Sequence, residues 1–130
     1  MAVSKKPSVL VADDDKSMRD LLRFILNSED YPVVGEASNG IDAVMNCVEL
    51  KPDIVLLDIN MPKMDGIQAL EEILKARPSM MVLMVSGDVT IDKVKEVLAK
   101  GAAGFLVKPL KPASVLDKIN SCWKQRHHHA

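Results

Sequence analysis

Acidic, hydroxyl and basic side chains follow four of the five short apolar runs in the chain. They are Asp13, Asp14 and Asp15 after the first run, Asp58 after the third, Ser86 after the fourth and Lys108 after the fifth. Clustered carboxylates repel one another unless a hard cation neutralises them, and oxygen ligands suit Mg²⁺. A carboxylate can also act as a nucleophile and form an aspartyl phosphate. The set therefore predicts Mg²⁺-dependent phosphoryl transfer, in which Lys108 and Ser86 bind phosphoryl oxygens.

Each of these residues also has a simple structural explanation. The aspartates at 13–15 can cap a helix, and we expect this for Asp15. Asp58 can be a turn residue, Ser86 begins a common Ser-Gly turn pair, and Lys108 can be a solvated surface lysine. Their joint position at the ends of apolar runs favours a shared site over four separate structural roles.

The apolar runs alternate five times with segments whose apolar residues recur at helical spacing. We expect strands at 8–12, 33–37, 54–57, 81–85 and 105–107. The first, third and fourth runs are apolar on both faces, which is typical of a parallel sheet covered by helices on both sides. The predicted fold is α/β: a flavodoxin-like (βα)5 doubly wound parallel sheet of strand order 2-1-3-4-5. The first, third and fourth strands are then central neighbours, and the polar residues converge at their carboxyl ends.

Composition limits the other functions. The chain has 130 residues, the usual size of one domain, and a net charge of −1 argues against a nucleic-acid-binding face. No apolar run approaches the length of a membrane span, so we expect a cytoplasmic location without membrane contact. Cys47 and Cys122 are expected to be reduced and buried.

All three histidines lie at 127–129. The rest of the chain therefore holds no Ser-His or Cys-His triad and no His-ligated metal, and any phosphohistidine donor must be another molecule or domain. We expect a domain at 7–124 and a tail at 125–130, which is either native or the remnant of a tag.

Four sequence stretches in this order are similar to one known family. They are V-L-V-A-D-D-D-K-S-M-R, D-I-V-L-L-D-I-N-M-P-K-M-D-G, V-L-M-V-S-G-D and G-F-L-V-K-P. With these stretches the chain resembles the receiver domains of two-component response regulators, the CheY-like group, from Ser8 to about Trp123. Each stretch alone is a weak signal, whereas the ordered set is very specific.

The resemblance implies a role for each site position. Asp58 corresponds to the phosphoacceptor, Ser86 to the switch residue that bonds the phosphoryl group, and Lys108 to the family's invariant lysine, with a cis bond to Pro109. Phe105 occupies the aromatic position that swings inward on activation, although the family often has Tyr there, so a contact through a tyrosine hydroxyl is absent. The implied Mg²⁺ ligands, with Mn²⁺ as a substitute, are Asp13, Asp14, Asp58 and the backbone carbonyl of Asn60.

The resemblance also implies partners. A histidine kinase or phosphotransfer protein donates the phosphoryl group, and an output protein or domain reads the face formed by the expected fourth helix, fifth strand and fifth helix. The chain is then a monomer or a phosphorylation-dependent dimer, and either a stand-alone regulator or part of a longer one. It is not a conventional enzyme, but it catalyses its own phosphorylation and the hydrolysis of its aspartyl phosphate. Asn60 and Asp88 tune this hydrolysis, and we expect a short phosphoryl lifetime.

Three other functions are compatible with parts of this sequence. A haloacid dehalogenase-type phosphatase also uses a nucleophilic Asp with Mg²⁺, but the run Asp13-Asp14-Asp15-Lys16 fits its motif poorly and its chains are much longer. A flavodoxin binds FMN phosphate after the first strand, where three aspartates would repel it, and its flavin needs aromatic neighbours that are scarce here. A phosphorylation-independent binding module is the remaining alternative.

Overall fold

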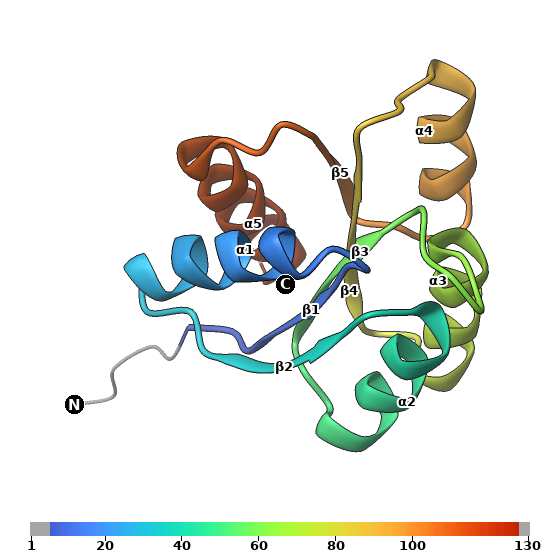
Figure 1. Ribbon diagram of the computed structural model, residues 1–130, viewed down its shortest axis with the longest axis horizontal. Coiled ribbons are helices and arrows are strands. Elements are labelled where there is room, and N and C mark those ends of the chain that lie inside the picture. The colour runs from blue at the N-terminus through green and yellow to red at the C-terminus, as the bar shows by residue number, and fades with distance from the viewer. Residues whose placement is uncertain (1–5, 128–130) are drawn as a thin grey trace.

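Five parallel strands alternate with five helices in the computed structural model, which describes residues 6–127. The strands are β1 (Val9–Ala12), β2 (Val33–Ala37), β3 (Ile54–Asp58), β4 (Met81–Ser86) and β5 (Gly104–Val107). The helices are α1 (Lys16–Ser28), α2 (Gly40–Leu50), α3 (Gly66–Ala76), α4 (Ile91–Ala99) and α5 (Pro112–His127). The strand order is β2-β1-β3-β4-β5 (Figure 1), which confirms the predicted fold class.

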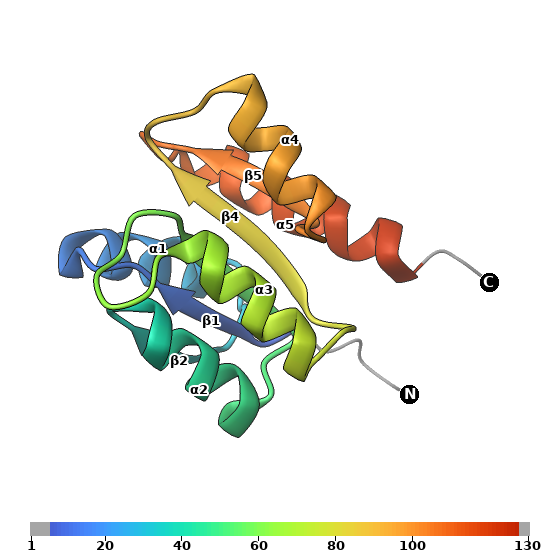
Figure 2. The ribbon, with the colours of Figure 1, turned by 90° about the vertical axis from the view of Figure 1, so that its right-hand side faces the viewer.

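Helices cover both faces of the sheet. Helices α1 and α5 lie on one face, and α2, α3 and α4 lie on the other (Figures 1 and 2). Every residue of β1, β3 and β4 is buried, as expected for strands that pack against helices on both sides. Two aliphatic cores result, one on each face. The first includes Leu22, Ile25 and Ile119, and the second includes Cys47, Leu70 and Val97.

Polar residues start four of the helices and a glycine follows the fourth. The side chains of Asp15, Asn39, Asp65 and Thr90 each accept a hydrogen bond from a backbone N–H in the first turn. The expected cap at Asp15 is therefore present. Gly101 follows α4 with a φ of 106°, a left-handed conformation that strains residues with a Cβ. A glycine in this conformation just after the last turn is typical of a helix end.

The C-terminal helix continues past the expected domain end at 124. It runs through His127, and the remaining tail residues 128–130 lie outside the described part of the chain. The boundary at 124 and the origin of the tail stay predictions. The expectation of two buried cysteines holds for Cys47 but is wrong for Cys122, which is half-buried because it lies near the end of α5. No helix within residues 6–127 is long and apolar enough to span a membrane.

Replacing Asn39 with alanine is expected to lower the free energy of unfolding by about 1 kcal/mol, because the cap of α2 is lost. The Asn39 side chain accepts a hydrogen bond of 2.8 Å from the backbone N–H of Asp42 and donates one of 3.0 Å to its carboxylate. Urea denaturation of Asn39→Ala measures the loss. The exposed neighbour Ser38 serves as the control, and an equal loss in Ser38→Ala contradicts the assignment.

Candidate functional site

The register of neighbouring strands brings the first acidic residues together. Ala12 of β1 pairs with Leu57 of β3, so Asp13, just after β1, and Asp58, the last residue of β3, lie at the same level. The backbone N–H of Asp13 also donates to the carbonyl of Ala37, which extends the sheet pairing past β1. Both carboxylates are buried, with exposed fractions of 1% for Asp13 and 3% for Asp58. Two acidic side chains are therefore fixed at the carboxyl edge of the sheet.

Asp14 completes an acidic cluster. Carboxylate oxygens of Asp13, Asp14 and Asp58 all lie within 4.8 Å of one another, and Asp14 is exposed to solvent. The Asp14 side chain makes no hydrogen bond or ion pair within residues 6–127. Its place in the cluster therefore depends on the backbone that carries it, while its oxygens are free to bind a ligand.

Lys108, the residue that follows β5, supplies positive charge to the site. Its ammonium lies 3.1 Å from a carboxylate oxygen of Asp13 and 3.3 Å from one of Asp58. The backbone N–H of Lys108 donates to the carbonyl of Ser86, and the following bond to Pro109 is cis, as the family resemblance implies. One ammonium thus bridges two of the three carboxylates.

The electrostatic balance leaves Asp58 unusually easy to protonate. Burial, with the neighbouring charge of Asp13 as a second cause, raises the pKa of Asp58 to about 6 despite the attraction of Lys108. Burial also works to lower the pKa of Lys108, but its hydrogen bond to Asp13 and the charge of Asp58 outweigh burial, so the pKa is raised. The site therefore carries an excess of negative charge that a bound cation can relieve.

Replacing Lys108 with methionine is expected to raise the pKa of Asp58 further above 6, because Lys108 is the only cation within residues 6–127 that contacts this carboxylate. The readout is a carbon-13 NMR titration of the Asp58 carboxyl in EDTA. Lys111→Met, which changes an exposed lysine nearby, is the control. An unchanged or lower pKa of Asp58 in Lys108→Met contradicts this electrostatic account.

Ser86 lies at the end of β4, beside β3, and is 1% exposed. Its hydroxyl accepts a hydrogen bond from the backbone N–H of Asp88 at 3.1 Å and donates one to the Asp88 carbonyl at 3.3 Å. The hydroxyl is thus engaged by the loop after β4 and not by the acidic cluster. To bond a group on Asp58, it must give up its bond to the Asp88 carbonyl.

The loop after β3 folds back tightly against the end of that strand. The backbone N–H of Gly66 donates to the carbonyl of Ile59 at 2.7 Å, and a Cβ at position 66 would lie 2.1 Å from the carbonyl oxygen of Asp58. Asn60 is exposed in this loop, and its carbonyl accepts no hydrogen bond within residues 6–127. The carbonyl is therefore available to a ligand.

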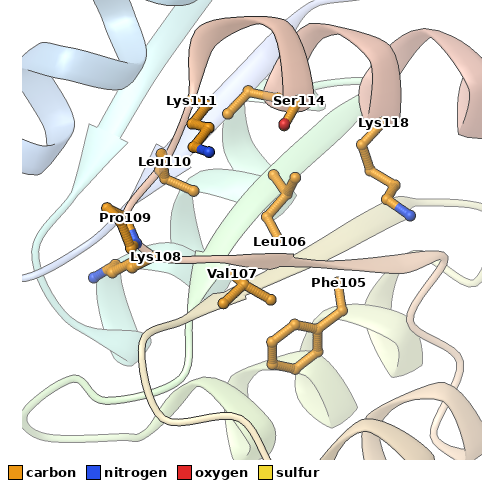
Figure 3. A pocket seen from close by; sticks show the side chains of 10 residues that line it. Phe105, Leu106, Val107, Lys108, Pro109, Leu110, Lys111, Ser114 and Lys118 are labelled. Atoms are coloured by element: carbon orange, nitrogen blue, oxygen red, sulfur yellow. The ribbon is translucent and has the colours of Figure 1, made fainter.

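Phe105 is half-buried on the α4 side of β5 and packs against the core shared with α2 and α3. The next residue, Leu106, points to the opposite side, toward α5 (Figure 3). A cavity of about 470 Å³ lies along β5 and the start of α5. Its lining includes Lys108, Lys111 and Lys118, together with Phe105 and Val107. The strand that carries Lys108 into the site thus also forms a basic and apolar surface.

Two structural features of the site had no assigned role in the sequence. Gly66 ends the second of the four family stretches, but the stretch alone does not reveal that its close approach to Asp58 requires the missing side chain. The guanidinium of Arg19 donates to the backbone carbonyl of Asp13 at 2.8 Å. The signal for Arg19 was its place in the stretch that begins at Val9, but no spacing rule links an arginine to a carbonyl six residues earlier.

Comparisons with known proteins agree on one family. A family model described as a response regulator receiver domain matches residues 9–120. The chemotaxis protein CheY of Thermotoga maritima is 42% identical over 116 residues, which cover 89% of this chain and 97% of that protein. The CheY of Listeria monocytogenes is 41% identical, with coverage of 89% and 98%.

Solved structures show the same fold. A complex of CheX with CheY, BeF3 and Mg from Borrelia burgdorferi matches with a TM-score of 0.89 and 37% identity, over 92% of this chain and 90% of that chain. The response regulator domain of Thermotoga maritima CheB matches with a TM-score of 0.86 and 36% identity, over 92% and 98%. At these identities the match extends beyond the fold to the family.

Proposed function

The chain belongs to the response regulator receiver domain family of two-component phosphorelays, and from this premise we propose that Asp58 is its phosphoacceptor. The observation that carries the proposal is the arrangement around this one carboxylate. Asp58 is buried at the carboxyl end of a central strand, beside two other aspartates and within 3.3 Å of the Lys108 ammonium. A carboxylate in that setting is positioned to attack an electrophile held by the surrounding charges.

The donor set fits a magnesium ion. Asp13, Asp14, Asp58 and the carbonyl of Asn60 offer only oxygen atoms, which Mg²⁺ prefers, and the clustered carboxylates carry negative charge that a dication neutralises. Mn²⁺ accepts the same ligands. When bound, the ion supplies charge neutralisation for the incoming phosphoryl group. The CheY complex from Borrelia burgdorferi contains BeF3 and Mg, which supports the same chemistry here.

Each residue of the site has a separate role in the reaction. A carboxylate oxygen of Asp58 attacks the phosphorus in line, the bond to the donor nitrogen or oxygen breaks, and the donor leaves with the electron pair. Lys108, already beside Asp58, pairs with an oxygen of the transferred group, as an ammonium does with phosphate. Ser86 turns its hydroxyl from the Asp88 carbonyl toward another phosphoryl oxygen. Water later hydrolyses the aspartyl phosphate, at a rate that Asn60 and Asp88 influence.

The output is a population shift between two conformations. When Ser86 moves toward the phosphoryl group, the half-buried ring of Phe105 fills the vacated space and the face formed by α4, β5 and α5 changes. Exposed apolar side chains on this face, Ile91, Leu98 and Val107, and the lysines of the cavity in Figure 3 suit an output protein or domain with apolar and acidic groups. A histidine kinase or phosphotransfer protein is the donor.

Intact-mass measurement tests the proposal. The chain is incubated with acetyl phosphate in Mg²⁺, in Mn²⁺ and in EDTA. We expect the mass of one phosphoryl group with either metal and none in EDTA, followed by loss of the group well within hours once the donor is removed. Equal uptake in EDTA contradicts the metal site, and no uptake in any condition contradicts the phosphoacceptor.

A further inference from the structure

Arg19 connects the acidic loop to the neighbouring strand. Its guanidinium donates from Nη1 to the backbone carbonyl of Asp13 at 2.8 Å and from Nε to a carboxylate oxygen of Glu36 at 2.9 Å. The Arg19 side chain is 15% exposed, so both bonds are largely shielded from water. A charge-assisted hydrogen bond of this kind is stronger than a neutral one. The peptide that joins Asp13 to Asp14 is therefore held from outside the acidic cluster.

Glu36 is itself well anchored on β2. Its second carboxylate oxygen pairs with Arg23 at 3.0 Å, and its backbone carbonyl accepts a hydrogen bond of 3.1 Å from the Asn46 side chain of α2. Glu36 thus carries one negative charge between two guanidinium groups, those of Arg19 and Arg23. The loop after β1 is thus tied to α1, β2 and α2 through one arginine.

We propose that Arg19 is a positioning residue for the cation site: it fixes the Asp13–Asp14 peptide and thereby holds the Asp14 carboxylate in the cluster. Asp13 has other restraints, since its carboxylate accepts hydrogen bonds from Lys108 and from the backbone N–H of Asp15. Asp14 has none of its own within the described residues, so its direction follows the peptide plane that Arg19 holds. This inference rests on the proposed Mg²⁺ site.

Two effects of removing Arg19 have opposite signs. Loss of a positive charge near a cation site strengthens cation binding by Coulomb's law alone. Loss of the bond to the Asp13 carbonyl releases the Asp14 carboxylate and weakens cation binding. Arg19 bonds a backbone carbonyl and not a carboxylate of the cluster, and Glu36 at 2.9 Å offsets part of its charge, so we expect the second effect to be larger. The direction of the change therefore distinguishes positioning from simple electrostatics.

The test is a calorimetric titration of the unphosphorylated chain with Mg²⁺. Arg19→Met keeps the apolar stem of the side chain and is expected to weaken Mg²⁺ binding about tenfold, the lower end of the range for residues that orient metal ligands. Arg23→Met is the matched control, since Arg23 pairs with the same Glu36 but makes no bond to the acidic loop within residues 6–127. We expect the Mg²⁺ affinity of Arg23→Met to stay within about twofold of the wild-type affinity, consistent with the loss of an exposed ion pair.

A second readout is local. The Asp14 N–H belongs to the same peptide as the Asp13 carbonyl, so its nitrogen-15 chemical shift should move in Arg19→Met and not in Arg23→Met. Arg19→Lys keeps the positive charge but has a single nitrogen, whereas Arg19 bonds through two. We expect this variant to weaken Mg²⁺ binding severalfold, and it serves as the test if Arg19→Met is too unstable to titrate. Unchanged or tighter binding in the Arg19 variants overturns the inference while leaving the site intact. Absence of Mg²⁺ binding in the wild type overturns the site itself.

Discussion

Replacing Asp58 with asparagine is expected to abolish phosphoryl uptake and to make the fold more stable at neutral pH. The amide has the shape of the carboxylate but no nucleophilic anion, so no aspartyl phosphate can form. It also removes one of three clustered negative charges. Lys108 keeps its bond to Asp13 in this variant, so its ammonium is not left unpaired. Intact mass after treatment with acetyl phosphate and Mg²⁺ measures the first effect, and urea denaturation in EDTA measures the second.

The pKa of Asp58 sets the sign and the pH range of the stability change. Its folded-state pKa of about 6 lies above the ordinary 3.8, so the carboxyl group favours the folded state below about pH 4, and this contribution is lost as the pH rises through 6. The ionised group then costs the folded state on the order of 2 kcal/mol after solvent screening. We therefore expect the free energy of unfolding of Asp58→Asn to exceed that of the wild type by this amount at pH 7.5 and by little at pH 4. An Asn variant that is less stable than the wild type at pH 7.5 contradicts the raised pKa.

Replacing Gly66 with alanine is expected to destabilise the fold by about 3 kcal/mol or more and to distort the site. The new Cβ would lie 2.1 Å from the carbonyl oxygen of Asp58 and 2.7 Å from the Cα of Ile59. Both are backbone atoms, one in the last residue of β3 and one in the residue after it, so no side-chain rotation relieves the clash. The loop must move away, and the Asn60 carbonyl moves with it.

Gly87 provides the matched control for Gly66. A Cβ at position 87 would make an ordinary contact of 3.6 Å with the Cβ of Lys108. Gly87→Ala is therefore expected to change the free energy of unfolding by less than about 1 kcal/mol. Denaturation curves of the two variants give the comparison, and similar stabilities would show that the loop can relax without cost.

The sequence was sufficient for the sheet and for most of the acidic site. Fully apolar runs mark β1, β3 and β4, and parallel pairing then requires residues at or just beyond the strand ends, such as Asp13, Asp58 and Lys108, to meet at one edge. The strands follow from periodicity, and the converging charges follow once the flavodoxin-like strand order is adopted for a five-stranded sheet. The residue roles still needed the family resemblance, because spacing alone does not distinguish a nucleophile from a metal ligand.

Contacts that depend on loop conformation could not be predicted in the same way. The approach of Gly66 to Asp58, the bond between Arg19 and the Asp13 carbonyl, and the engagement of Ser86 by Asp88 all involve backbone atoms. No residue pattern specifies which carbonyl a loop presents. The domain boundary at 124 stays a prediction; α5 runs through His127, and residues 124–127 hold no proline or glycine to end a helix.

The most direct test of the account locates the phosphoryl group within the chain. The protein is treated with acetyl phosphate and Mg²⁺ and then with borohydride, which reduces an aspartyl phosphate to homoserine, and its peptides are sequenced by tandem mass spectrometry. The account predicts this conversion at position 58 alone, and no conversion when EDTA replaces Mg²⁺. Conversion at Asp13 or Asp14, or a phosphoryl group on a serine or a histidine, would contradict the assignment of Asp58 as the phosphoacceptor.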